Sequence, residues 1–493
     1  MNFKLLLVTG ILAFSAAACK DNSTAGNGNG NGTTEQPQGD VSIYVTTTSR
    51  SSDLKLTKID FSDQPFTLAT TVKLKQSEKF QTIDGFGAAV TGSTCFNLLK
   101  MTAADRAAFL KQTYSDTEGF GISYIRISIG CSDFSLSEYT CWDNREAGFA
   151  LTNEETQYVI PVLKEILAIN PNIKVIGSPW TCPRWMKVNN LNDLQPYNSW
   201  TSGQLNPAYY AEYGEYFVEW IRAFEAQGIK IYAVTPQNEP LNRGNSASLF
   251  MGWQEQRDFL NNGLVPKIKA AGLTAKIYLF DHNYNYDNMG DQNDYPVKIY
   301  NSGVDAEVVV GAAYHNYGGN RSELNDIHSQ APTKELIFSE ASIGTWNDGR
   351  DLEKSLLRDM EELGLGTVIN WCKAVIVWNL MLDNDRAPNR EGGCTICYGA
   401  VDIDNTNYKT ITRNSHYYII AHLASVVKPN ATRIGVSGFQ PAGVIMSAFE
   451  NADGTYALVL LNKNESNQDL TIDDGVHHFS YTLPAKAVVS MKW

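Results

Sequence analysis

Short apolar runs that end in polar or aromatic residues recur along the middle of the chain. Eight of them can be found, at residues 80–89, 124–135, 173–180, 231–240, 276–283, 308–317, 335–342 and 374–383. Amphipathic stretches such as 154–169, 207–227 and 351–363 lie between them and predict helices. Eight alternating strand and helix units predict a (β/α)₈ barrel over residues 80–425. The doubly wound alternative needs a glycine-rich loop after its first strand, and residues 84–87 supply only a fragment of one.

The hydrophobic pattern changes on both sides of this barrel. Residues 444–451, 455–464, 468–472 and 487–493 alternate or run apolar between turn residues, as antiparallel strands do. Residues 41–48 and 66–74 have the same texture and precede the first barrel strand. We therefore predict an α/β fold in which a β-sandwich, formed from residues 41–79 and 426–493, is appended to the (β/α)₈ TIM barrel.

The first residues predict export rather than a folded element. Lys4 precedes an apolar run over residues 5–14 and a small-residue stretch that ends at Cys19, so residues 1–19 resemble the signal peptide of a bacterial lipoprotein with Cys19 lipidated. Ala16 stands where that consensus usually has Leu, and a plain cleaved signal is the alternative. Residues 20–40 predict a flexible linker. The expected location is the outer membrane or cell surface, otherwise the periplasm or the medium, with a lipid as the one membrane contact.

Composition and charge limit the possible ligands. With 40 basic and 53 acidic residues the net charge is −13, which argues against nucleic acid as a partner and favours a neutral ligand. The 10 Trp and 24 Tyr fit either a large core or the recognition of sugar-ring faces. Cys394 and Cys397 favour a local disulfide in an oxidising compartment. No second CxxC motif and no His at ligand spacing follows them, so neither a metal nor a cofactor is predicted.

The strand ends supply the candidate chemistry, because active sites of such barrels lie at the carboxyl ends of the strands. Glu239 ends the fourth run and Glu340 the seventh. A single Glu in such a place can be a cap or a solvated side chain. Two carboxyl groups across a barrel mouth suit the cleavage of a glycosidic bond, in which one protonates the leaving oxygen and the other attacks or stabilises the anomeric carbon. The other strand-end candidates are Asp133, Trp180, Asn238, His282, His315, Tyr317, Trp378 and Asp383.

Several motifs in chain order resemble glycoside hydrolase family 30, the retaining β-glycosidases that include glucosylceramidases and β-1,6-glucanases. They lie at residues 81–92, 126–135, 178–187, 235–240, 281–283, 314–317, 338–342 and 378–383. The resemblance implies that Glu239 is the acid/base and Glu340 the nucleophile. It also implies that Asp133, Trp180, Asn238 and Trp378 line a sugar subsite, that His315 and Tyr317 belong to the sixth-strand motif with Tyr317 bonded to the nucleophile, and that Arg126 lies near Glu340.

The resemblance leaves the substrate open. We favour β-1,6-glucan, cleaved with retention of configuration by an endo-β-1,6-glucanase, because an exported, acidic, aromatic-rich enzyme suits an extracellular polysaccharide. Glucosylceramide, or another β-glucoside or β-xyloside, is the alternative within the family. A surface glycan-binding lipoprotein on an inactive barrel is the alternative outside it. Residues 387–400 match the family pattern loosely, Arg126 could simply pair with a barrel carboxylate, and His282 could be a satisfied strand-end histidine.

Overall fold

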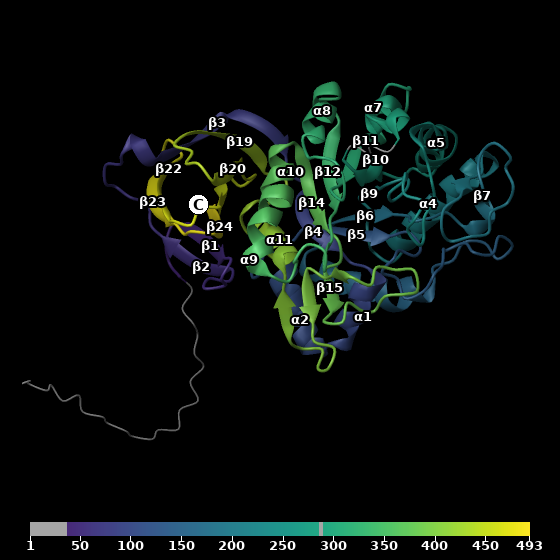
Figure 1. Cartoon of the computed structure of the whole chain (residues 1–493), viewed down its shortest axis with the longest axis horizontal. Helices are drawn as coiled ribbons and strands as arrows, with labels where there is room; N and C mark the ends of the chain where they lie inside the picture. The colour runs from purple at the N-terminus through teal and green to yellow at the C-terminus, as the bar shows by residue number, and fades with distance from the viewer. Residues whose placement is uncertain (1–36, 285–288) are drawn as a thin grey trace, which may run out of the picture. The chain divides into compact units, whose positions relative to one another are not determined.

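Eight parallel strands close into a barrel in the computed structural model, which describes residues 37–284 and 289–493 (Figure 1). Their order around the barrel follows the chain, as the eight-fold strand and helix pattern predicts, so the (β/α)₈ prediction is confirmed. The strands are β4 (Gly85–Ala89), β5 (Tyr124–Ser128), β6 (Lys174–Ser178), β9 (Ala233–Val234), β10 (Lys276–Asn283), β11 (Val309–His315), β12 (Glu335–Glu340) and β14 (Cys372–Val377).

The barrel interior is filled with side chains. Its inward residues form one buried cluster of Tyr124, Ile176, Ala233, Tyr278, Ala313, Ile337, Ala374 and Ile376. The neighbouring backbones pack so closely that a Cβ at Gly87 would lie 1.6 Å from the carbonyl oxygen of Tyr124. Glycine is therefore required on β4, and the packed interior holds the carboxyl ends of the strands in fixed positions.

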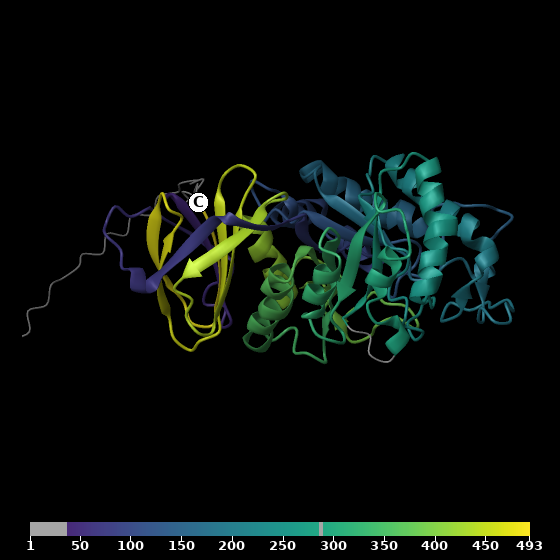
Figure 2. The same ribbon diagram turned by 90° about the horizontal axis from the view of Figure 1, so that it is seen from above.

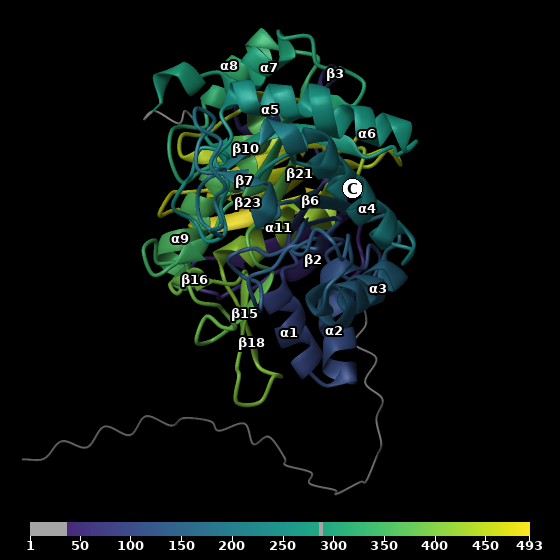
Figure 3. The same ribbon diagram turned by 90° about the vertical axis from the view of Figure 1, so that its right-hand side faces the viewer.

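Helices surround the barrel. The predicted helical segments are present, although two contain a turn of π-helix: Glu155–Val159 precedes α3 (Ile160–Ile169), and Met360–Leu365 follows α9 (Leu352–Asp359). Helices α4 and α6 pack against each other on the outside of the barrel (Figure 3). The remaining helices are α1 (Gly92–Lys100), α2 (Ala103–Tyr114), α4 (Tyr210–Glu225), α5 (Trp253–Phe259), α6 (Val265–Ala270), α7 (Tyr295–Tyr300), α8 (Glu323–Gln330), α10 (Gly366–Ile369) and α11 (Ser415–Val426).

Strands from both sides of the barrel segment form the second domain (Figure 2). They make one hydrogen-bonded sheet in the order β2-β1-β24-β21-β20-β19-β3-β22-β23, with its own apolar core. The strands are β1 (Val41–Thr47), β2 (Lys55–Ile59), β3 (Thr71–Thr82), β19 (Thr432–Gly438), β20 (Val444–Glu450), β21 (Tyr456–Asn462), β22 (Gln468–Asp473), β23 (His478–Leu483) and β24 (Ala487–Lys492). Strand β3 continues to Thr82, past the boundary predicted at residue 79, because residues 79 and 82 still pair with β19.

Helix α11 connects the two domains through a buried histidine. His422 Nδ1 lies 2.9 Å from Ser490 Oγ on β24, and its Nε2 lies 2.8 Å from Thr46 Oγ1 on β1. Burial lowers the pKa of His422 to about 3, so this side chain stays neutral and acts as a structural link.

The predicted signal, lipidation site and most of the linker fall on residues 1–36, which lie outside the described residues. Within the part of the chain that the structure describes, no helix combines the length and the apolar character needed to cross a membrane.

Candidate active site

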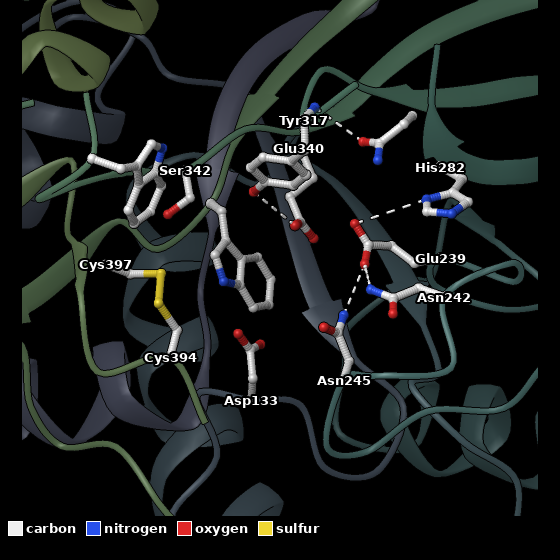
Figure 4. A pocket seen from close by; sticks show the side chains of 13 residues that line it. Asp133, Glu239, Asn242, Asn245, His282, Tyr317, Glu340, Ser342, Cys394 and Cys397 are labelled. Atoms are coloured by element: carbon white, nitrogen blue, oxygen red, sulfur yellow. Dashed lines mark hydrogen bonds and ion pairs between the residues drawn. A yellow bond between two sulfur atoms is a disulfide. The ribbon is translucent and has the colours of Figure 1, made fainter. Parts of the chain in front are cut away.

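The carboxyl ends of the barrel strands surround a cleft of about 390 Å³ (Figure 4). Glu239 and Glu340 face each other across it, with Asp133 nearby in the same view, and Trp378 also lines the cleft. The lining consists of Asp133, Glu239, Asn242, Asn245, His282, Asn283, Tyr317, Glu340, Ser342, Trp346, Trp378, Cys394 and Cys397. This mixture of carboxyl, amide and indole groups offers hydrogen bonds and flat apolar faces to a polar ligand.

Glu340, the last residue of β12, is held by two donors. Arg126 Nη1 donates to its Oε2 at 2.6 Å, and the Tyr317 hydroxyl donates to its Oε1 at 3.0 Å. A guanidinium stays charged at any relevant pH and accepts no proton, so these partners complement an ionised carboxylate. Both contacts were expected from the sequence.

Arg126 is fully buried on β5 and organises the floor of the cleft. Its Nη2 also donates to Asp281 Oδ2 and to Asn238 Oδ1, both at 2.8 Å, which fixes the orientation of the Asn238 amide. Its guanidinium lies 4.9 Å from the ring centre of Trp180, which stacks on Trp378 at 5.1 Å. Removing one partner of a buried charge leaves that charge uncompensated, which is costly, so these side chains hold one another in place.

Glu239 lies in an irregular segment that follows β9 in the chain, rather than at the end of a regular strand. Strand β9 stops at Val234, but the Glu239 amide still donates to the Asp281 carbonyl at 2.9 Å. Glu239 has φ 45° and Asp281 φ 62°, in the left-handed region that costs a non-glycine residue about 1–3 kcal/mol. The surrounding hydrogen bonds therefore hold the Glu239 carboxyl in one position over the cleft.

The two oxygens of the Glu239 carboxyl have different partners. The amides of Asn242 and Asn245 each donate to Oε2 at 2.8 Å. Oε1 lies 3.2 Å from His315 Nδ1 and 3.9 Å from His282 Nδ1. The same His315 nitrogen is 4.0 Å from Glu340 Oε1, so one imidazole bridges the two carboxyl groups. Both carboxyl groups therefore have a neighbour that can carry or release a proton, and Glu239 lies closer to it, at 3.2 Å.

The pKa values in this group are strongly shifted. Burial would raise the pKa of Glu239, but the hydrogen bond with His315, the nearby imidazoles and Asn242 lower it to about 2. Burial would lower the pKa of His315, but the charge of Glu340 and the contacts with Asp281 and Glu239 raise it to about 9. Burial raises the pKa of Glu340, against the charges of His315 and Arg126. The proton therefore resides on His315, and the Glu239 and His315 pair holds it as a unit.

Asp133 is poised to accept a hydrogen bond. Its Oδ1 is buried at the cleft without a partner among the described residues. Burial, together with the charges of Glu340 and Glu239, raises the pKa of Asp133 to about 7. A buried carboxyl oxygen of this kind needs a partner, and a ligand hydroxyl in the cleft would supply one.

The loosely matching loop of residues 387–400 forms one wall of the cleft. The expected disulfide between Cys394 and Cys397 is present and faces the cleft, and the other cysteines among the described residues are free and buried. Arg390 anchors the loop by donating to the Ser132 carbonyl at 2.9 Å, to Glu138 at 3.1 Å and to the Ser246 carbonyl. The loop thus supports the backbone on either side of the cleft.

The structure separates the predicted site residues into two layers. Glu239, Glu340, Asp133, Tyr317 and Trp378 line the cleft. Trp180, Asn238, His315 and Arg126 are buried behind these residues and contact them. Asp383, another strand-end candidate, lies outside the lining on β15 (Met381–Asp383), where it accepts backbone hydrogen bonds from residues 385 and 387.

Some site residues were missed from the sequence. Asn242 and Asn245 follow Glu239 closely in an asparagine-rich turn, which was the available signal. Asp281 sits in a motif already noted, and it accepts hydrogen bonds from Arg126, Thr235 and Ser339. Ser342 and Trp346 come from the loop after β12, and Trp346 is 48% exposed at the cleft.

Known proteins resemble the chain over almost all of its length. Residues 83–427 match the glycosyl hydrolase family 30 TIM-barrel domain, and residues 430–491 match the beta sandwich domain of the same family. The endo-1,6-beta-D-glucanase BGN16.3 of Trichoderma harzianum is 32% identical over 83% of this chain and 84% of its own. The lysosomal acid glucosylceramidase of Mus musculus is 25% identical over 85% of this chain and 82% of its own. The solved structure of the endo-beta1,6-glucanase BT3312 is 64% identical, with a TM-score of 0.90, over 93% of this chain and 99% of that one.

Proposed function

Because the chain belongs to glycosyl hydrolase family 30, we propose that this glycoside hydrolase cleaves β-1,6 linkages within glucan chains and retains the configuration at the anomeric carbon. The observation that supports the reaction is the pair of cleft carboxyl groups with unlike partners, Arg126 and Tyr317 on Glu340, and His315 on Glu239. The name of the 64% identical structure, an endo-beta1,6-glucanase, supports the substrate.

In the proposed reaction, Glu340 is the nucleophile. Its carboxylate attacks the anomeric carbon, and the bond from that carbon to O6 of the next glucose breaks. Glu239 gives its proton to the departing oxygen. In the second step Glu239, now ionised, takes a proton from water, and the resulting hydroxide displaces Glu340 from the same carbon. Two inversions at one carbon give net retention.

His315 accounts for the proton that Glu239 needs. The pKa order in this structure, with Glu239 low and Glu340 raised, is the reverse of the order that the first step requires. Movement of one proton across the 3.2 Å contact from His315 Nδ1 to Glu239 Oε1 makes the acid and leaves His315 neutral. Glu340 keeps Arg126 and Tyr317 as donors throughout, which favours its anion.

Asn242→Ala is expected to move the alkaline limb of the kcat/KM profile to higher pH by about one unit. The Asn242 amide stabilises ionised Glu239, so its loss raises the pKa of the acid and keeps it protonated to higher pH. A hydrogen bond to a charged group contributes about 1.5–3 kcal/mol, and one pKa unit corresponds to about 1.4 kcal/mol. The measurement is a kcat/KM profile from pH 4 to 10.

Asn262→Ala is the matched control, because the Asn262 amide donates to the Asp258 carbonyl in its own helical segment and is exposed. Its profile should superimpose on that of the wild type. An alkaline limb that stays at the same pH or moves to lower pH in Asn242→Ala would argue against Glu239 as the group that limits activity at high pH.

Parallel digestion of β-1,6-glucan, β-1,3-glucan and a glucosylceramide analogue tests the substrate. We expect rapid cleavage of β-1,6-glucan, with a ladder of short oligosaccharides among the early products. Glucose as the sole early product would replace endo action with exo action. Preference for the ceramide analogue would favour the alternative seen among the relatives, and binding of glucan without reducing sugar at any pH from 4 to 8 would favour a non-catalytic glycan-binding protein.

We also propose that the chain is exported and anchored by a lipid on Cys19. The support is the charged, apolar and small-residue order of residues 4–19, followed by a polar linker. Labelled palmitate should enter the wild-type protein, and Cys19→Ser should lose both the label and the membrane fraction. An unlabelled wild type with its mature N-terminus elsewhere would replace this proposal with a plain cleaved signal.

A further inference from the structure

Three side chains with metal-ligating atoms meet on one wall of the cleft. Among the described residues, Glu239, His282 and His315 each bring one nitrogen or oxygen atom within 4.8 Å of the other two. All three are buried, and they come from the segment after β9 and from the carboxyl ends of β10 and β11. We propose that they form a binding site for a divalent transition-metal ion such as Zn²⁺, and that an ion bound there blocks hydrolysis.

Two of the three ligand-to-ligand distances are close to those of a tetrahedral site, and the third, between the two histidines, is within 4.8 Å. Bonds of about 2.0–2.1 Å at tetrahedral angles place neighbouring ligand atoms about 3.4 Å apart. Glu239 Oε1 lies 3.2 Å from His315 Nδ1 and 3.9 Å from His282 Nδ1, and Figure 4 shows His282 directed at this carboxyl. Small side-chain rotations would bring the three atoms around one ion. Two imidazoles and one carboxylate form a ligand set that Zn²⁺ uses in proteins.

His315 already has the support that a metal-ligating histidine usually has. Its Nε2 lies 3.0 Å from Asp281 Oδ1, which leaves Nδ1 directed at Glu239. A carboxylate on the far nitrogen fixes the ring orientation and raises the basicity of the ligand nitrogen. Asp281 is itself held by Ser339 and Thr235, so the ring cannot turn away easily.

The position and charge of the site also suit a cation. Glu239 and His282 both line the cleft, so solvent or a ligand can fill a fourth coordination position. Glu340 Oε1 lies 4.0 Å from the same His315 nitrogen, and Asp133 lines the cleft as well. Arg126 offsets part of this negative charge but is bonded to Asp281 and Glu340 beneath the cleft.

Metal binding and hydrolysis would exclude each other. A Glu239 oxygen bound to a metal cannot carry the proton that the departing sugar oxygen needs, and the ion would occupy space that the substrate requires. Inhibition should therefore be reversible by a chelator and weaker at high glucan concentration. This inference adds a regulatory ligand to the cleft and is independent of which sugar the protein cleaves.

Titration of the untagged protein with Co²⁺, followed by visible absorption, tests the site without any substrate. We expect one equivalent to give the intense d–d bands of a low-coordinate ion, and Zn²⁺ to displace it. Loss of a residue that only supports a metal ligand weakens metal affinity by about 10–100-fold. His282→Asn removes a ligand itself and should therefore weaken Co²⁺ binding by a larger factor. Glu239→Gln, which nearly preserves the side-chain shape, should do the same, with circular dichroism to check that both variants fold.

His328→Asn is the matched control, because His328 stacks on Trp371 at 3.7 Å and is absent from the cleft lining. It should bind Co²⁺ like the wild type. Absence of saturable Co²⁺ bands in the wild type, or equal binding by the wild type and folded His282→Asn, would overturn the proposal. Zn²⁺ that inhibits the wild type and His282→Asn at the same concentration would overturn it as well. A protein that cleaves none of the glucans could still pass the Co²⁺ test, so the two proposals fail separately.

Discussion

Glu340→Ala is expected to lower kcat on β-1,6-glucan by about 10⁵-fold or more. The substitution removes the proposed nucleophile, so the covalent intermediate can no longer form. Deletion of a nucleophile from an enzyme lowers kcat by a factor of this order. Arg126 and Tyr317 would remain in place beside a small space. The measurement is the initial rate of reducing-sugar release at saturating glucan.

Azide makes this prediction specific. An azide ion in the space left by Glu340→Ala can attack the anomeric carbon from the vacated side, so a β-glycoside with a good leaving group should give an α-glycosyl azide. Glu335→Ala is the control, because Glu335 lies at the opposite end of the same strand and pairs with Lys276 and Lys373. A β-glycosyl azide from Glu340→Ala, or rates near those of the wild type, would remove Glu340 from the nucleophile role.

Glu239→Gln is expected to lower kcat/KM on β-1,6-glucan by about 10²–10⁴-fold, the usual contribution of a positioned general acid. The leaving group in glucan is a sugar alkoxide, which departs poorly without a proton. In a dinitrophenyl β-glycoside of the β-1,6-linked disaccharide, the dinitrophenolate departs without a proton. The first step on this substrate should therefore be nearly unaffected by Glu239→Gln. The contrast between these two substrates, measured by steady-state and burst kinetics, identifies the acid.

The alkaline limb and azide provide the checks on Glu239→Gln. The variant should lose the alkaline limb of the wild-type profile, and azide should restore turnover of the dinitrophenyl substrate as a β-glycosyl azide, because the intermediate on Glu340 is attacked from the face that water uses. Gln237→Ala tests for general disruption of the segment, since Gln237 bonds the Trp180 and Asn238 carbonyls. Equal losses on both substrates in Glu239→Gln would mean that Glu239 is not the acid.

The barrel was predictable because its signal repeats. Eight apolar runs, each followed by a helical pattern, fit the barrel and little else, and the two ends of the chain had the texture of antiparallel strands. The domain boundary predicted at residue 79 falls within β3, because this strand passes from the sandwich to the barrel entrance without a turn signal. The short β9 was also unexpected, since residues 231–240 read as a continuous strand but curve out of regular pairing before Glu239.

The chemistry was only partly predictable. Strand-end position led to Glu239 and Glu340, but periodicity does not reveal which strand-end side chains face the cleft and which lie behind them. Trp180 and His315 are therefore buried neighbours of lining residues rather than part of the lining. The amides on Glu239 come from a turn whose path depends on the loop anchored by Arg390, and such contacts are fixed by tertiary packing.

The stereochemistry of cleavage tests the central claim most directly. Proton NMR of wild-type protein acting on β-1,6-glucan should show new reducing ends appearing first as the β-anomer, with the α-anomer growing later by mutarotation, because double displacement through Glu340 retains configuration. New reducing ends that appear first as the α-anomer would contradict the covalent role of Glu340 and the paired action of Glu239.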